Sequence, residues 1–165
     1  MKIFSVIGHS GTGKTTLVTK LISHFTSLGY NVGSIKSIHR ENFSLDKEGK
    51  DTYEHRKAGA EPVCALTGRD VSLIFNATLE FSRITELFNY LKKDLLIVEG
   101  MKDKDFPSII CSKEKEGGIE MAKGKDVICF SGLLSDKEKE IKGKPVISYT
   151  EVQKIASLVL EHLEE

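Results

Sequence analysis

The sequence predicts a three-layer α/β domain whose sheet is mostly parallel, with an antiparallel hairpin portion. Short apolar runs typical of buried strands alternate with segments in which apolar residues recur at helical spacing. A glycine-rich turn separates the first such run from the first helical segment, and two further runs flank the tight turn Gly68-Arg69-Asp70. With 165 residues, 39% of them apolar, the chain can bury the core of one domain spanning residues 1–165.

The opening of the chain predicts a strand-helix-strand unit. Residues 2–7 are mostly β-branched or aromatic, as in a buried strand. A helix from Thr15 to Leu28 should follow, because apolar residues recur along it at helical spacing and Gly29 can end it in a left-handed conformation. The next strand is expected at Asn31–Lys36, joined by a right-handed parallel crossover.

The middle of the chain begins with residues 37–51, which are polar and lack periodicity, as in a long functional loop. The elements expected after it are a helix at Asp51–Ala58, hairpin strands at Pro62–Thr67 and Val71–Phe75, a helix near Ser82–Lys93, and a strand at Leu95–Val98. The last of these is an uninterrupted apolar run, which predicts burial on both faces of the sheet.

The second half of the chain gives weaker signals. Strands are expected at Ser108–Cys111, Asp126–Phe130 and Pro145–Ser148, and the lysine- and glutamate-rich segments between them are predicted to be solvated surface. A final helix is indicated by an apolar stripe that ends at Leu163, and Thr150 with Gln153 predicts a capping box at its start.

Charge and cysteine usage exclude several classes of protein. Lysine plus arginine and aspartate plus glutamate each total 24, so no global field favours nucleic acid or an anionic membrane as a partner. No apolar stretch approaches the roughly 20 residues of a spanning helix. Cys64, Cys111 and Cys129 form no metal-type pair and are expected to be buried free thiols, which indicates a reducing, cytoplasmic compartment.

The glycine-rich turn carries the strongest motif. Gly8-His9-Ser10-Gly11-Thr12-Gly13-Lys14-Thr15 matches Gly-x-x-x-x-Gly-Lys-Thr, the phosphate-binding loop (P-loop, or Walker A motif). A chance match in a chain of this length has odds of about 1% or less. The strand before it and the helix after it make chance rarer still. The motif therefore predicts a P-loop NTPase fold that binds a Mg-nucleoside triphosphate.

Each residue type in this loop suits phosphate binding for its own reason. The glycines let the backbone turn, so that amides from Ser10 to Thr16 point at phosphate oxygens. Lys14 is expected to bridge the β- and γ-phosphates, and the Thr15 hydroxyl to bind Mg²⁺. His9 is expected to face solvent. The predicted nucleotide-binding residues of the loop are Gly8, Ser10, Gly11, Thr12, Gly13, Lys14, Thr15 and Thr16.

A P-loop site also needs a carboxylate near the metal. Asp94 and Glu99 flank the strand Leu95–Val98, and ligands of parallel sheets lie beyond the carboxyl ends of the strands. Glu99 is therefore predicted to bind the metal or position the attacking water, and Lys14, Glu99 and Asp46 are the candidate catalytic residues. Asp46 and Asp51, in the polar loop, are further candidates for the metal or for sensing the γ-phosphate.

Three segments together resemble the molybdopterin-guanine dinucleotide biosynthesis protein B (MobB) family. They are the loop Gly8–Leu17, then Asp46–Thr52 with Ala58-Gly59-Ala60, and finally Val98–Lys102 with Pro107. Many P-loop proteins share the first segment, and the other two are more specific. Beyond Lys113 the similarity is loose.

The resemblance implies a GTP-binding partner in the last step of molybdenum cofactor maturation, where GMP is joined to molybdopterin. Family members look like homodimers that bind GTP, hydrolyse it slowly and assist a separate molybdenum cofactor guanylyltransferase. It further implies that Thr15, with Asp46 and Glu99, serves Mg²⁺, and that Lys50 and Lys102 contact phosphate or the molybdopterin cofactor.

The chain departs from the family pattern in two places. Ser37 stands where the family usually has a histidine, and His39 is a candidate for that role. The guanine-reading motif Asn/Thr-Lys-x-Asp is not present, and Ser131–Asp136 is the best substitute location. The preference for GTP is thus implied by the resemblance alone.

Four functions stay open from the sequence. The leading hypothesis is a slow GTPase that acts as an accessory protein, and the second is a nucleotide-dependent adaptor in which hydrolysis is incidental. A small metabolite kinase is less favoured, since the chain has only four arginines and no evident lid. A nickel-delivery GTPase is disfavoured because the cysteines and histidines form no soft-metal cluster.

Overall fold

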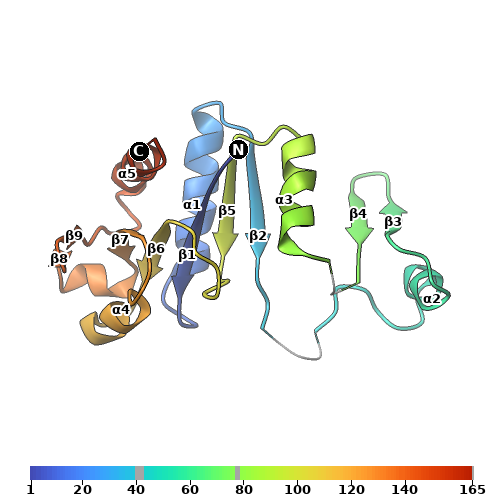
Figure 1. The fold of residues 1–165 in the computed structure, drawn as a ribbon, viewed down its shortest axis with the longest axis horizontal. Helices are drawn as coiled ribbons and strands as arrows, with labels where there is room; N and C mark the ends of the chain where they lie inside the picture. Colours follow the sequence, from blue (N-terminus) through green and yellow to red (C-terminus); the bar gives the residue numbers. More distant parts are fainter. Residues whose placement is uncertain (40–42, 77–78, 165) are drawn as a thin grey trace. The chain divides into compact units, whose positions relative to one another are not determined.

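The computed structural model describes residues 1–39, 43–76 and 79–164. They form two compact units, one of residues 1–37 with 88–165 and one of residues 38–87 (Figure 1). The first unit is built on a five-stranded sheet, and the second contains a short helix and a two-stranded sheet. No helix within the described ranges has both the length and the apolar character needed to cross a bilayer.

The five-stranded sheet is parallel throughout, as the alternation of strands and helices predicts. Its strands are β1 (Lys2–Gly8), β2 (Val32–Lys36), β5 (Leu95–Glu99), β6 (Ser108–Cys111) and β7 (Val127–Ser131), in the order β2-β5-β1-β6-β7. All five residues of β5 are buried, which confirms the prediction from its apolar run. The carboxyl ends of parallel strands share one edge, where Gly8, Lys36 and Glu99 end their strands.

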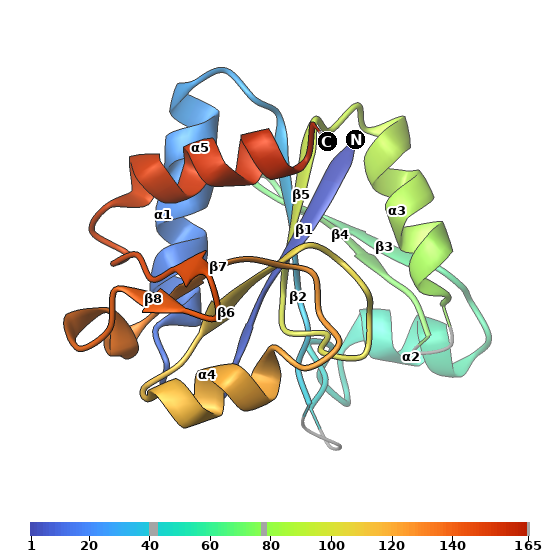
Figure 2. The ribbon, with the colours of Figure 1, turned by 60° about the vertical axis from the view of Figure 1, so that its left-hand side comes forward.

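Helices cover both faces of this sheet. They are α1 (Lys14–Ser27), α4 (Lys115–Met121), α5 (Val152–His162) and the 3-10 turn η1 (Leu133–Asp136). Because side chains alternate along a strand, Phe4 and Val6 of β1 join one core with α1 and α5, while Ile7 joins another with η1 and α4. Figure 2 shows α1 and α5 on the same face. The predicted three-layer arrangement is confirmed.

Helix α4 was not predicted from the sequence, which indicated only solvated surface there. The helix has seven residues, two of them the glycines Gly117 and Gly118, so it lacks an apolar stripe. Gly118 is buried, and a side chain there would begin 3.4 Å from the ring of Phe130, an ordinary contact distance. The apolar residues that pack on the core, Ile119, Met121 and Ala122, lie close together at the end of the helix, and so few of them give no clear helical period.

The C-terminal third differs from the prediction at two further points. The strand expected at Pro145–Ser148 is shorter: β9 (Lys144–Pro145) pairs with β8 (Glu140–Ile141), and Val146 adds one parallel bridge to Phe130. The predicted capping box is wrong, because α5 begins after Glu151 without a side-chain cap. The Thr150 hydroxyl contacts the Ser148 hydroxyl at 2.9 Å instead.

The second unit contains the predicted helix and hairpin. Helix α2 (Asp51–Lys57) precedes strands β3 (Val63–Leu66) and β4 (Val71–Ile74), which pair antiparallel as a separate two-stranded sheet. The backbone amide of Thr67 donates to the Asp70 carbonyl and closes the hairpin turn. Helix α3 (Phe81–Tyr90) begins in this unit and ends in the first.

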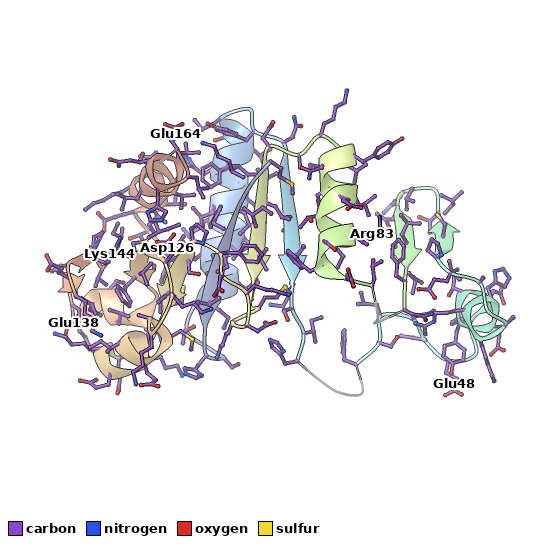
Figure 3. The ribbon with its side chains drawn as sticks, viewed as in Figure 1. Glu48, Arg83, Asp126, Glu138, Lys144 and Glu164 are labelled. Atoms are coloured by element: carbon purple, nitrogen blue, oxygen red, sulfur yellow. The ribbon has the colours of Figure 1, made fainter. Side chains whose placement is uncertain are left out.

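The three cysteines differ in exposure. Cys111 and Cys129 are buried, as predicted, but Cys64 is exposed, so the prediction for Cys64 is wrong. Cys64 lies on β3 (Val63–Leu66), and only the opposite face of this strand is packed inward. The sequence pattern did not show which of the two faces would be buried. Charged side chains such as Glu48, Asp126 and Glu164 lie on the outside of their units (Figure 3).

Candidate functional site

The predicted P-loop connects β1 to α1, as the motif requires. Gly8 ends the strand where the backbone passes close to β6, since a methyl group on Gly8 would lie 2.1 Å from the Cys111 carbonyl oxygen. Gly13 precedes the helix in the left-handed region, with φ of 91°. The local sequence therefore folds into a tight turn that larger side chains would disrupt.

The start of α1 offers backbone donors to an anion. Its first intrahelical bond runs from the Leu17 amide to the Gly13 carbonyl, and no side chain caps the helix. The amides from Gly13 to Thr16 therefore precede the helical ladder and carry the positive end of the helix dipole. This donor set fits phosphate, which is the group the motif predicts.

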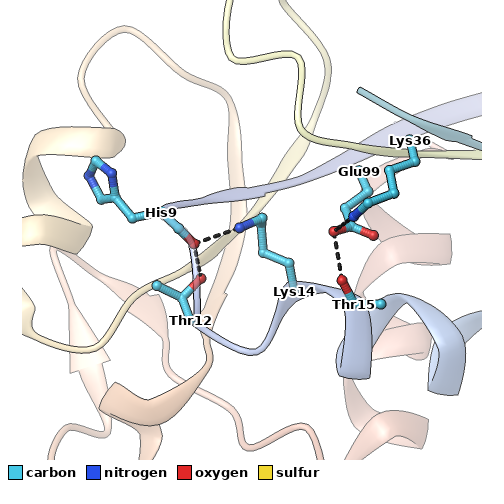
Figure 4. Close-up of polar contacts among 6 residues, drawn as sticks. All are labelled: His9, Thr12, Lys14, Thr15, Lys36 and Glu99. Atoms are coloured by element: carbon cyan, nitrogen blue, oxygen red, sulfur yellow. Dashed lines mark hydrogen bonds and ion pairs between the residues drawn. The ribbon is translucent and has the colours of Figure 1, made fainter. Parts of the chain in front are cut away.

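Lys14 reaches back across the loop (Figure 4). Its ammonium donates to the His9 carbonyl oxygen at 2.5 Å, and the Thr12 hydroxyl donates to the same oxygen at 2.9 Å. The His9 side chain is exposed, as predicted. Burial lowers the pKa of Lys14 from its ordinary value, and the positive charges of Lys36 and Lys102 act in the same direction, while Cys111 and Glu99 oppose it. A phosphate would supply the negative charge that this crowded ammonium lacks.

Glu99 lies beside Thr15, at the carboxyl end of β5. The Thr15 hydroxyl donates to Glu99 Oε1 at 2.8 Å, and only 6% of the glutamate is exposed. Asp94, the alternative carboxylate, sits at the opposite end of the strand and accepts a bond from the Asn31 amide at 2.7 Å. Of the two carboxylates that flank β5, Glu99 is thus the one that lies next to Thr15, the predicted metal ligand.

Lys36 completes this cluster, and the sequence analysis did not select it. Its ammonium lies 2.5 Å from Glu99 Oε1, the oxygen that Thr15 also contacts (Figure 4). Lys36 is the Cα partner of Glu99 in the β2–β5 pairing, so its position follows from sheet register. The sequence offered one indication of this role: Lys36 is the last residue of a predicted parallel strand, and such residues lie at the ligand-binding edge of the sheet.

Two further residues of the first unit border the loop. The Lys113 ammonium lies 3.6 Å from the point where a side chain on Gly11 would begin. Gly132, directly after β7, approaches so closely that a methyl group would lie 2.5 Å from the Thr12 carbonyl oxygen. The residues after β6 and β7 thus pack against the phosphate loop.

Several predicted site residues belong to the second unit. Asp46 accepts a bond from the Thr52 hydroxyl at 2.8 Å and pairs with Arg56 at 3.4 Å, which ties the polar loop to α2. Lys50 is the N-cap residue of that helix, and Asp51 is its first residue. Lys102 lies in the first unit, is exposed, and is close enough to affect the charge of Lys14.

The oxygen donors at the P-loop suit a Mg²⁺ site that is completed by phosphate and water. Among the described residues, no group of three or more histidine, cysteine or acidic side chains is arranged to hold a metal ion. A P-loop metal site does not require such a group, because phosphate and water oxygens supply most of the ligands of Mg²⁺. The hydroxyl of Thr15 and the carboxylate of Glu99 are oxygen donors of the kind Mg²⁺ accepts.

Comparison with known proteins adds a family to this geometry. Residues 3–131 match the family model of molybdopterin guanine dinucleotide synthesis protein B. The chain is 30% identical over 146 residues to a probable molybdopterin-guanine dinucleotide biosynthesis adapter protein of Bacillus subtilis (strain 168), covering 87% of this chain and 83% of that protein. It is 35% identical over 112 residues to the adapter protein of Escherichia coli (strain K12), covering 66% and 63%. The match to the second relative thus spans less than two thirds of its length.

Solved structures agree with the sequence matches. The crystal structure of Bacillus subtilis MobB superposes with a TM-score of 0.80 at 27% identity, covering 99% of this chain and 98% of that one. A MobB homolog from Bacillus stearothermophilus gives 0.72 at 18% identity, covering 99% of each chain, which shows a shared fold.

Proposed function

This chain belongs to the molybdopterin guanine dinucleotide synthesis protein B (MobB) family, and we propose that it is a GTP-binding adapter in molybdenum cofactor biosynthesis. In this role it assists a molybdenum cofactor guanylyltransferase, which joins GMP to molybdopterin. The observation that carries the nucleotide part of the proposal is the contact of Thr15 with Glu99 at the mouth of the P-loop.

Different residues at the P-loop bind different parts of Mg-GTP. The amides from Gly11 to Thr16 bind phosphate oxygens, and Lys14 exchanges the His9 carbonyl for the β- and γ-phosphates. Thr15 and Glu99 hold Mg²⁺, directly or through water. Bound Mg²⁺ would neutralise phosphate charge and polarise the terminal phosphoryl group.

The guanine base is assigned to residues 131–136, which comprise the last residue of β7, Gly132 and η1. Gly132 packs on Thr12, so the residues that follow it border the phosphate loop. The hydroxyls of Ser131 and Ser135 are used inside the fold, on the carbonyls of Ile147 and Gly132. Asp136 is exposed and is the acceptor available for the donors on guanine.

Slow hydrolysis fits the surroundings of Glu99. Glu99 already accepts from the Thr15 hydroxyl, and in this proposal it also serves Mg²⁺, so it orients a water molecule rather than removing its proton. Asp46 remains a proposed second carboxylate, for the metal or the γ-phosphate. In the alternative function, an adaptor without functional hydrolysis, bound nucleotide alone promotes guanylyl transfer.

A homodimer is proposed from the hairpin of the second unit. One face of this hairpin consists of Cys64, Leu66, Val71 and Leu73, and all four side chains are exposed. A two-stranded sheet is marginal alone, and an exposed apolar face of this kind favours association. A second copy of the chain supplies the same face, as a two-fold interface requires.

The remaining contacts concern the partner and the cofactor. Lys50 and Lys102 are proposed to contact phosphate groups of GTP or of molybdopterin, as exposed cations outside the loop. The balanced charge of the chain supports a protein partner in the cytoplasm over nucleic acid or a membrane surface.

The test is a calorimetric titration of GTP and ATP with MgCl₂ present, and of GTP with EDTA. The proposal expects GTP to bind more tightly than ATP, and more tightly with Mg²⁺ than without it. Equal binding of both nucleotides removes the guanine assignment, and no binding of either removes the nucleotide function.

A companion assay separates the slow GTPase from the adaptor. Glu99→Gln is expected to lower GTP hydrolysis, and activation of the guanylyltransferase is measured in parallel. Activation that falls with hydrolysis supports the GTPase, whereas activation that survives supports the adaptor.

A further inference from the structure

Two donors converge on a single carboxylate oxygen at the predicted metal position. Glu99 Oε1 accepts from the Thr15 hydroxyl at 2.8 Å and from the Lys36 ammonium at 2.5 Å. The two donors come from different elements, α1 and the end of β2. Figure 4 shows both contacts, one from Thr15 at the start of α1 and one from Lys36 on the strand next to Glu99.

The ammonium compensates a buried negative charge. Only 7% of the Glu99 side chain is exposed, against 55% of the Lys36 side chain. A buried carboxylate is costly without a cation or several donors, and Lys36 supplies the cation. Lys36 itself keeps access to solvent and can leave without being buried elsewhere.

Lys36 and a divalent ion would compete for the same place. Thr15 and Lys36 both donate to Glu99 Oε1, so an ion held by Thr15 and by Glu99, directly or through water, would take up the side of the carboxylate that now faces Lys36. The ammonium and the ion repel each other at that position. Lys14 and Lys102 add positive charge nearby, because both Lys36 and Lys102 affect the ionisation of Lys14.

We propose that Lys36 is an internal counter-ion that takes the place of Mg²⁺ at Glu99 and releases that carboxylate when Mg-GTP binds. The inference rests on the proposed function, since it assumes that GTP and Mg²⁺ bind at the P-loop. Lys36 is a positioning residue in this scheme: it holds the Glu99 carboxylate beside Thr15 until the metal binds.

The scheme predicts a particular coupling between Lys36 and the metal. Without Mg²⁺, loss of Lys36 leaves the Glu99 charge uncompensated, and this charge repels the triphosphate. With Mg²⁺, the metal compensates Glu99, so the lysine matters little. A lysine that only contacted phosphate would instead contribute under both conditions.

The experiment measures GTP affinity of Lys36→Met by calorimetry in EDTA and in MgCl₂. We expect the affinity in EDTA to fall about tenfold and the affinity in MgCl₂ to stay within about threefold of wild type. The factor by which Mg²⁺ improves binding therefore grows. Lys36→Arg keeps the charge and should restore the wild-type factor, while Lys154→Met, on the exposed face of α5, serves as the matched control.

A double variant keeps the inference testable if Lys36→Met folds poorly. In a Glu99→Gln background the carboxylate charge is gone, so adding Lys36→Met should not weaken binding in EDTA further. Equal weakening by Lys36→Met in EDTA and MgCl₂, or no change in either, overturns the inference. Failure of the wild-type protein to bind GTP overturns the proposed function instead, so the two failures are distinguishable.

Discussion

The hydroxyl of Thr15 contacts the carboxylate of Glu99 across 84 positions of sequence, at 2.8 Å. Thr15→Val keeps the shape of the side chain and removes the donor. We expect GTP affinity in MgCl₂ to fall about tenfold to a hundredfold, because the metal loses a ligand, with little change in EDTA. Calorimetry under both conditions measures this. Thr15→Ser keeps the hydroxyl and should bind as wild type, and a loss with serine equal to that with valine would contradict the metal role.

Lys14 gives the second prediction. Lys14→Ala should fold normally, since the ammonium bonds only a loop carbonyl, but triphosphate binding should weaken by roughly tenfold to over a hundredfold. Calorimetry measures the affinity, and circular dichroism checks the fold. Lys20→Ala, further along the same helix, is the control and should bind normally. Unchanged affinity in Lys14→Ala would remove the phosphate-loop interpretation.

The glycine after β7 gives a prediction about stability. Gly132 has φ of +91°, and a methyl group there would lie 2.5 Å from the Thr12 carbonyl oxygen and 2.9 Å from that of Ser112. Gly124 also has positive φ, at +67°, but no atom within 4 Å of such a methyl group. Gly124→Ala is therefore a control for backbone strain without a clash.

We expect Gly124→Ala to lower the free energy of unfolding by about 1 kcal/mol and Gly132→Ala by about 3 kcal/mol. Urea denaturation measures both. Gly132→Ala should also weaken GTP binding, because Thr12 must move. Equal losses of stability in the two variants would show that the approach of Gly132 to the phosphate loop is not tightly constrained.

A site residue could be predicted from the sequence only where the residues around it in the chain form a recognisable pattern. The loop Gly8–Thr15 follows from spacing within eight residues, and Glu99 follows from strand direction, a rule that holds for all parallel sheets. Lys36 had no such signal. Its contact with Glu99 depends on the pairing of β2 with β5, in which Lys36 lies opposite a residue 63 positions further along the chain. The sequence of neither strand shows which strand it pairs with.

The missed elements have related causes. Helix α4 has only seven residues, two of them glycines, so its apolar residues are too few to form the stripe by which helices are predicted. The exposure of Cys64 depends on which face of the β3–β4 hairpin packs inward, and both faces carry apolar residues. The periodicity of apolar residues therefore identifies neither so short a helix nor the face of a hairpin that packs inward.

The buried cysteines predict an alkaline loss of stability. Desolvation by burial raises the pKa of Cys111, and likewise of Cys129, from 9.0 to about 12. In the unfolded chain each thiol loses its proton near pH 9, while in the folded protein it keeps the proton to about pH 12. Between these values the unfolded state binds fewer protons, so rising pH favours unfolding.

Each thiol should contribute a loss of about 1.4 kcal/mol per pH unit in that window. Urea denaturation from pH 8 to 11 measures the slope. Cys111→Ala is expected to be less stable at pH 8 because of a small cavity, but its stability should decline less steeply above pH 9. Cys64→Ala is the control, since its side chain is exposed. A slope in Cys111→Ala as steep as in wild type would contradict the assignment.

The exposed hairpin face gives the last prediction, which concerns assembly. Leu66 and Val71 face each other across β3 and β4, and 75% and 69% of these residues are exposed. If a second copy covers this face, the double variant Leu66→Lys, Val71→Lys places two positive charges from each copy in the same apolar interface, where they repel one another and lose their contact with water. We expect the wild-type chain to sediment as a dimer and the variant as a monomer at micromolar concentration. Leu28→Lys, which replaces another exposed leucine at the end of α1, is the control and should remain dimeric. A variant that stays dimeric would place the interface elsewhere, and a monomeric wild-type chain would remove the dimer itself.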